Sequence, residues 1–126
     1  MTRERFELIA QEAFDGLPGN FRERIENVHI VVEDYPAEEV AGQGGRNKFS
    51  LLGLYQGIPL TKRGTWYGAS PTVPDKITLY QRNIESTCRD EREIRERIVE
   101  VLFHEIGHYF GMNEAQIRNA MKDFNP

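Results

Sequence analysis

Apolar residues recur at helical spacing in the first segment of the chain and again in its last third. Near the N-terminus this spacing predicts an amphipathic helix over residues 3–14, which ends before the stop signal at residues 16–19. In the last third, two adjacent apolar stripes predict a long helix that is buried over much of its circumference. One stripe holds Ile94, Ile98, Val101 and Leu102, and the other holds Val99, Phe103, Ile106 and Phe110.

The ends of the later helices are marked by capping residues. Ser86 or Thr87 is the predicted N-cap of the long helix, and Gly111 is the predicted residue just past its end. Asn113 is then placed to cap a closing helix over residues 114–124.

Three segments between these helices have the composition of β-strands. Residues 28–32 are apolar and β-branched, and residues 49–55 are largely apolar with a glycine near their end. Residues 76–80 alternate between polar and apolar side chains, which predicts a strand that is exposed on one face.

Residues 104–114 carry the pattern H-E-x-x-H-x-x-G-x-x-E. His104 and His108 are four residues apart on the predicted helix, so both imidazoles lie on one face and can converge on one ion. Glu105 lies between them, where a carboxylate can reach a water at that ion. Gly111 lets the chain turn, and Glu114 offers a third ligand. The pattern predicts a catalytic zinc site with three protein ligands and an open position.

Each of these residues also has a structural interpretation. A single histidine on an apolar helix face is commonly a core residue, but a pair at this spacing favours a metal. Glu114 also suits the first turn of the closing helix, where the helix dipole stabilises an acid, and Asp123 is the alternative third ligand. Gly107 costs a helix about 1 kcal/mol relative to alanine, which indicates close packing or room for substrate.

Length and composition narrow the class of protein. The 126 residues predict a single domain, residues 1–126. The single cysteine, Cys88, excludes an intrachain disulfide and a thiolate-rich zinc site, so a metal must be held by imidazole and carboxylate. The net charge of −4, with both signs interspersed, argues against a nucleic-acid partner. Because no stretch resembles a membrane span or a signal peptide, we expect a cytoplasmic protein with no membrane partner.

The motif resembles that of the zincin metallopeptidases, and its extended form is closest to the metzincin arrangement. The small size, the motif near the C-terminus and the segments 52–60 and 77–80 resemble the small bacterial zincin-like family, or minimal zincins. This resemblance covers the chain from about residue 25 onward. It implies a zinc (Zn²⁺) cofactor held by three ligands, with Glu105 as the general base; the ligands are His104, His108 and Glu114.

The resemblance also implies a fold, a single zincin-like domain of the α+β class. A small mixed β-sheet of about three to four strands packs on two to four helices, with the metal motif on a long helix in the C-terminal half. The edge strand, identified with residues 76–80, is expected to bind an extended peptide.

The leading hypothesis is therefore a zinc-dependent metallopeptidase that acts on a peptide or protein substrate. Its tetrahedral intermediate needs a group to stabilise the oxyanion, and the candidates among possible substrate-binding residues are Tyr80, Tyr67 and Arg63. Arg63 and Tyr67 belong to a loop that also holds Lys62 and Trp66, and this loop either lines a substrate cleft or packs on the core.

Two other functions are compatible with the same sequence. A metal-dependent endoribonuclease is one, because a small ribosomal-RNA maturation family resembles the chain in size and in placing H-x-x-x-H-x-x-G near the C-terminus. The other is a non-catalytic module that zinc stabilises and that binds a partner. Replacement of Glu105 by glutamine would abolish either enzyme activity and leave the module unaffected.

Overall fold

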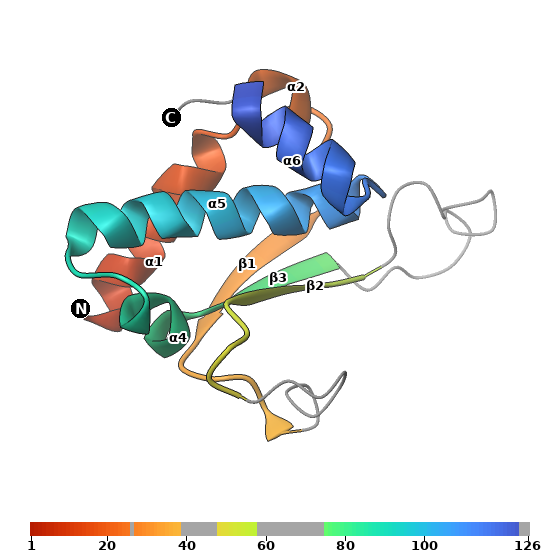
Figure 1. Cartoon of the computed structure of the whole chain (residues 1–126). Helices are drawn as coiled ribbons and strands as arrows, with labels where there is room; N and C mark the ends of the chain where they lie inside the picture. Colours follow the sequence, from red (N-terminus) through yellow and green to blue (C-terminus); the bar gives the residue numbers. More distant parts are fainter. Residues whose placement is uncertain (26, 39–47, 58–74, 124–126) are drawn as a thin grey trace.

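The computed structural model of the chain describes residues 1–25, 27–38, 48–57 and 75–123, and it has an α+β fold (Figure 1). Over these residues the elements in chain order are α1 (Arg3–Asp15), α2 (Gly19–Arg22), β1 (Val28–Glu33), β2 (Gly53–Gln56), β3 (Asp75–Tyr80), α4 (Gln81–Ser86), α5 (Glu91–Tyr109) and α6 (Glu114–Asp123).

The three described strands form one mixed sheet in the order β1-β3-β2. β1 runs parallel to β3, with Val28 opposite Asp75, whereas β2 runs antiparallel to β3, with Gly53 opposite Leu79. The prediction of a small mixed sheet on helices is confirmed. Within the described part of the chain β2 lies at one edge of the sheet and β3 at its centre.

The prediction that residues 76–80 form a half-exposed edge strand is wrong. β3 lies between its two neighbours, and all of its residues except Lys76 are buried. The polar positions of the alternating pattern include Thr78 and Tyr80, each 2% exposed, and such side chains enter a core when their polar atoms find partners. The central place of β3 depends on pairing with a distant segment, which local alternation does not encode.

The strand predicted over residues 49–55 begins later than expected. Residues 48–50 form a turn, and β2 starts at Gly53. The backbone N–H of Tyr80 donates to Leu52 O at 3.0 Å, which continues the pairing with β3 by one residue beyond β2.

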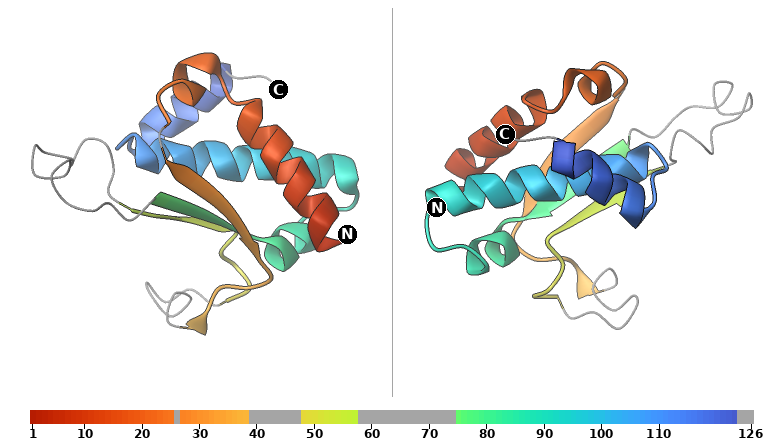
Figure 2. Two further views of the ribbon diagram at one scale, coloured as in Figure 1. Left: turned by 180° about the vertical axis from the view of Figure 1, so that it is seen from behind. Right: turned by 45° about the horizontal axis from the view of Figure 1, so that its top comes forward.

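Helices α1 and α5 pack against each other and cover the same face of the sheet, α1 over β1 and α5 over β2 and β3 (Figure 2). The helix predicted over residues 3–14 is confirmed as α1. None of the helices in the described ranges combines the length and apolar character that crossing a membrane requires. Large apolar side chains of the core come from α1, the sheet, α4, α5 and α6, and they include Phe6, Ile9, Ile77, Leu79, Ile84, Ile98, Leu102, Ile106 and Ile117.

The N-cap of α5 lies three or four residues later than predicted. Asp90 caps this helix, and its side chain accepts a hydrogen bond from Glu93 N–H at 2.9 Å. Ser86 and Thr87 instead end α4, a short helix that the sequence pattern did not predict. At the other end, Gly111 has φ +74°, as expected for a glycine that terminates a helix.

Candidate metal centre

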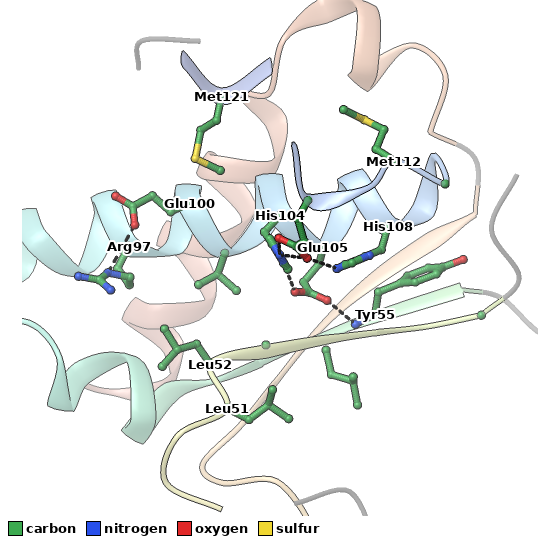
Figure 3. Close-up of a pocket in the computed structure, with 16 residues that line it drawn as sticks. Leu51, Leu52, Tyr55, Arg97, Glu100, His104, Glu105, His108, Met112 and Met121 are labelled. Carbon is green, nitrogen blue, oxygen red and sulfur yellow. Dashed lines mark hydrogen bonds and ion pairs between the residues drawn. The ribbon is translucent and has the colours of Figure 1, made fainter. Parts of the chain in front are cut away.

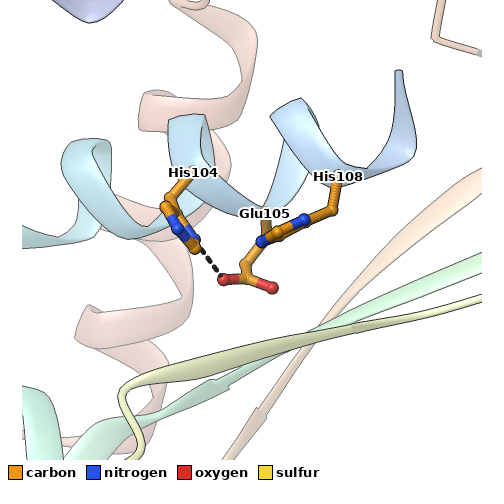
Figure 4. Close-up of side chains that lie close together, drawn as sticks. All are labelled: His104, Glu105 and His108. Carbon is orange, nitrogen blue, oxygen red and sulfur yellow. Dashed lines mark hydrogen bonds and ion pairs between the residues drawn. The ribbon is translucent and has the colours of Figure 1, made fainter. Parts of the chain in front are cut away.

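The two histidines of the motif project from the same face of α5, near its C-terminal end (Figure 4). The ring centroids of His104 and His108 are 4.7 Å apart, and the ring planes meet at 81°. Both rings are partly exposed, because they lie where α5 passes from the core into a cleft. The helical spacing that the sequence predicted thus brings both imidazoles to one site.

Gly107 allows α6 to pack closely on α5 beside these histidines. A Cβ atom at this position would overlap Cγ1 and Cδ1 of Ile117, and Ile117 is itself buried in the core. Of the two interpretations of Gly107, the structure supports close packing. The glycine therefore fixes how near α6 lies to the motif.

The start of α6 is set by a reciprocal capping box. Asn113 Oδ1 accepts from Gln116 N–H, and Gln116 Oε1 accepts from Asn113 N–H, both at 2.8 Å. The predicted cap of the closing helix is confirmed. The box makes Glu114 the first residue of the helix, so that its side chain starts from a fixed backbone position.

The Glu114 carboxylate faces the Nε2 atoms of both histidines. Its oxygens lie 2.9 and 3.0 Å from His104 Nε2, and one of them lies 3.7 Å from His108 Nε2. The hydrogen bond with His104 is the main cause that lowers the pKa of Glu114. Three potential metal donors from α5 and α6 therefore point toward one place.

Glu105 faces the sheet rather than the solvent. Glu105 is 8% exposed, and both of its carboxylate oxygens lie within hydrogen-bond distance of a nitrogen. Oε1 accepts from the backbone N–H of Tyr55 on β2 at 2.8 Å, and Oε2 lies 2.8 Å from His104 Nδ1. The carboxylate thus links the helix of the motif to the edge strand of the sheet.

His104 lies between two carboxylates, one at each ring nitrogen. Burial lowers the pKa of His104, but the hydrogen bonds with Glu105 and Glu114 outweigh it and raise the pKa above its ordinary value. In the neutral tautomer that carries its proton on Nδ1, the ring donates to Glu105 and keeps the Nε2 lone pair for an ion.

These residues fit a zinc ion by donor chemistry and by placement. In the described part of the chain, one ligand atom from each of His104, Glu105 and His108 lies within 4.8 Å of the others. Imidazole nitrogens with a carboxylate oxygen are a donor set typical of catalytic zinc. Two carboxylates are near enough to complete the set, Glu105 on the Nδ1 side of His104 and Glu114 on the Nε2 side.

A cleft of about 920 Å³ runs between α5 and β2 and opens at this cluster (Figure 3). One wall is the outer edge of β2, and the other is a stripe of α5 residues spaced by three or four positions. That stripe consists of Arg97, Glu100, Val101, His104, Glu105 and His108. Met112, Glu114 and Met121, which follow α5 in the chain, also line the cleft.

Residues 25–122 match a family described as zincin-like metallopeptidase. The chain belongs to this family. The match covers more than half of the sequence and includes the whole motif and the three strands that the structure describes. Membership implies a metal cofactor, usually zinc, and confirms the resemblance that the motif indicated.

A solved structure supports the same fold for this zincin-like chain. A conserved hypothetical protein from Thermus thermophilus aligns with a TM-score of 0.55 and 21% identity, over 87% of this chain and 94% of its own. At this identity the likeness shows the fold alone. Among curated proteins, no sequence matches the chain.

Of the three predicted substrate-binding residues of this zincin-like protein, only Tyr80 lies within the described part of the chain. Arg63 and Tyr67 lie outside the described residues, as do Lys62 and Trp66. Tyr80 lies on the central strand, where burial, followed by the charges of Glu33 and Glu105, raises its pKa. It is 2% exposed and does not line the cleft, so its position gives no support to a role in substrate binding.

Three contributors to the site were not predicted from the sequence: Arg97, Val101 and the backbone N–H of Tyr55. Arg97 and Val101 line the cleft, and their spacing of seven and three residues before His104 could have placed them on its helix face. The contact between Tyr55 N–H and Glu105 is different, because a backbone donor on a distant strand leaves no signal in the residue types.

Proposed function

We propose that this protein is a zinc-dependent metallopeptidase in which three side chains hold the ion and Glu105 is the general base. The ligands are His104, His108 and Glu114. The observation that carries the proposal is the approach of both Nε2 atoms to one Glu114 carboxylate, at the mouth of a cleft that also contains Glu105. Family membership supports the same activity.

When bound, zinc supplies a Lewis acid that polarises the substrate carbonyl and lowers the pKa of water. Glu105 takes a proton from the attacking water on a carboxylate oxygen and delivers it to the leaving amine. Tyr55 N–H and His104 Nδ1 hold the two oxygens of this carboxylate, so its orientation is fixed before substrate arrives. A carboxylate held in this way needs no reorientation before it accepts the proton.

The substrate is proposed to be an extended peptide that pairs with β2 rather than with β3. Leu52 O accepts from Tyr80 N–H, so the residues two apart from Leu52 also turn their backbone groups toward β3. Gly53 and Tyr55 lie between these positions, and their backbone groups turn to the outer edge, where both residues line the cleft. Because Glu105 accepts from Tyr55 N–H, the peptide is proposed to pair through the backbone of Gly53. An added strand at this edge would pass beside the motif.

The test compares zinc content and cleavage of a broad peptide library in the wild type and two variants. We expect about one zinc per wild-type chain and measurable cleavage. Glu105→Gln should keep the zinc and lose at least about a hundredfold in kcat/KM, the range for loss of a general base. Glu114→Ala should lose both zinc and cleavage.

Glu96→Gln is the matched control, because Glu96 is an exposed acid on α5 that pairs with Arg92 and does not line the cleft. It should behave as the wild type. A wild type that holds zinc and cleaves nothing contradicts the peptidase and favours a non-catalytic module. Zinc that survives Glu114→Ala but not Glu105→Gln would exchange the roles of the two carboxylates.

A further inference from the structure

Gly53, the first residue of β2, occupies a position where a side chain does not fit. A Cβ atom here would lie 2.5 Å from Val101 Cγ1, 3.2 Å from the backbone oxygen of Thr78 and 3.7 Å from Glu105 Cγ. Two of these neighbours belong to α5 and one to β3. Gly53 is therefore a position where the backbone of the edge strand lies close to the helix of the motif.

This close approach occurs two residues before the strand contacts Glu105. Residues two apart on a strand turn to the same side, so the distance of Gly53 from α5 also sets that of Tyr55. The Tyr55 N–H reaches Glu105 Oε1 at 2.8 Å, a length that leaves little room for the strand to move away.

The neighbours of Gly53 cannot easily make room for a methyl group. Val101 is β-branched and lies within a helix, where such side chains strongly prefer one rotamer, and it is buried. The Thr78 oxygen is part of the central strand's backbone. An added methyl must therefore separate β2 from α5.

We propose that Gly53 is a positioning residue for Glu105. By lacking a side chain, it keeps the β2 backbone near enough to α5 for Tyr55 N–H to hold and orient the Glu105 carboxylate. The part of this proposal that concerns catalysis rests on the proposed function, whereas the part that concerns the Tyr55–Glu105 contact does not.

The first experiment follows the Tyr55 amide proton by NMR and needs no enzymatic activity. In Gly53→Ala the hydrogen bond to Glu105 should break, so the amide signal shifts toward its position in Glu105→Ala and its solvent exchange accelerates at least about tenfold. In Gly53→Ala/Val101→Ala the nearest obstruction is gone, and the wild-type signal should return.

Gly19→Ala is the control, since a Cβ at Gly19 meets nothing within 4 Å, and it should leave the Tyr55 amide unchanged. An unchanged Tyr55 amide in Gly53→Ala would overturn the proposal. If Gly53→Ala does not fold, the double variant decides: a folded double variant without the wild-type Tyr55 signal also overturns it.

The second experiment is kinetic and uses zinc-loaded protein. Gly53→Ala should lower kcat by about ten- to a hundredfold, a larger change than the one in KM, because a misplaced base slows chemistry more than binding. In a Glu105→Gln background, the same substitution should have almost no further effect. An equal loss in both backgrounds contradicts positioning through Glu105.

The two experiments separate the two proposals. Absence of cleavage in the wild type counts against the peptidase, while the Tyr55 amide still tests the role of Gly53. Cleavage in the wild type together with an unchanged amide in Gly53→Ala retains the peptidase and rejects the role of Gly53.

Discussion

At His104, a proton and a metal ion compete for the same lone pair. The ring faces Glu105 through Nδ1 and Glu114 through Nε2, and both contacts favour the imidazolium, in which both nitrogens are donors. Only the neutral ring binds a metal. The two carboxylates therefore stabilise the protonated ring, and zinc must displace that proton to bind.

We expect zinc affinity to fall as the pH falls, beginning at a higher pH than an ordinary histidine would give. The sign follows from the raised pKa of His104: the ring stays protonated up to a higher pH, and the proton must leave before zinc binds. Zinc titrations against a competing chelator between about pH 5 and about pH 8 measure the midpoint. Glu105→Ala removes one of the two carboxylates and should move this midpoint to lower pH. Coincident curves for the wild type and Glu105→Ala would refute this account.

At the scale of elements, the site depends on how α6 docks on α5. Gly107 and Ile117 set the distance between the helices, and the capping box at Asn113 sets where α6 begins. Glu114 follows directly from that box, so its reach toward the histidines is a property of the helix pair.

We expect Gly107→Ala to weaken zinc binding because the new methyl pushes Ile117, and with it α6, away from α5. Overpacking costs about 1–3 kcal/mol of stability, and the better helix propensity of alanine returns up to about 1 kcal/mol. Thermal unfolding with and without zinc measures both effects. Gly107→Ala/Ile117→Ala relieves the overlap and should recover zinc affinity. Undiminished zinc affinity in a destabilised Gly107→Ala would show that Glu114 does not depend on this packing.

What the sequence predicted well is what short segments determine. The spacing of His104 and His108 and the turn at Gly111 involve neighbours along one helix, and the structure places them as expected. The strand order was not predictable, because β3 is central through its pairing with both β1 and β2, and local residue patterns do not encode these pairings. For the same reason the Glu105 contact with β2 escaped sequence analysis: it joins segments whose meeting is decided by the whole fold.

At the scale of the whole molecule, α1 completes the core although it lies before residues 25–122, which match the family. Phe6 and Ile9 are fully buried. Arg3 ties the start of this helix to two other elements, donating to Val32 O at 2.9 Å and to Gln81 Oε1 at 2.8 Å. Helix α1, which precedes the residues that match the family, therefore covers part of the core that those residues form.

We expect Phe6→Ala to lower the free energy of unfolding by about 3–5 kcal/mol, the range for truncating a buried phenylalanine. Leu8 lies on the same helix and is 50% exposed, so Leu8→Ala should change stability by no more than about 0.5 kcal/mol. Urea denaturation of both variants measures the difference. Equal losses would mean that α1 does not contribute to the core as the structure indicates.

The outer edge of β2 has a consequence for what the proposed peptidase would cut. Unpaired sheet edges attract any free strand, and proteins commonly keep such edges short or covered. Here the edge strand has four residues, and it opens onto a cleft beside α5. A substrate that pairs with this edge, as proposed, must be a single extended chain whose backbone groups are free. Strands of a folded protein already have their backbone partners, so a peptidase that binds its substrate at this edge would select by conformation before sequence: it would admit frayed ends and unfolded chains and leave intact folded proteins uncut.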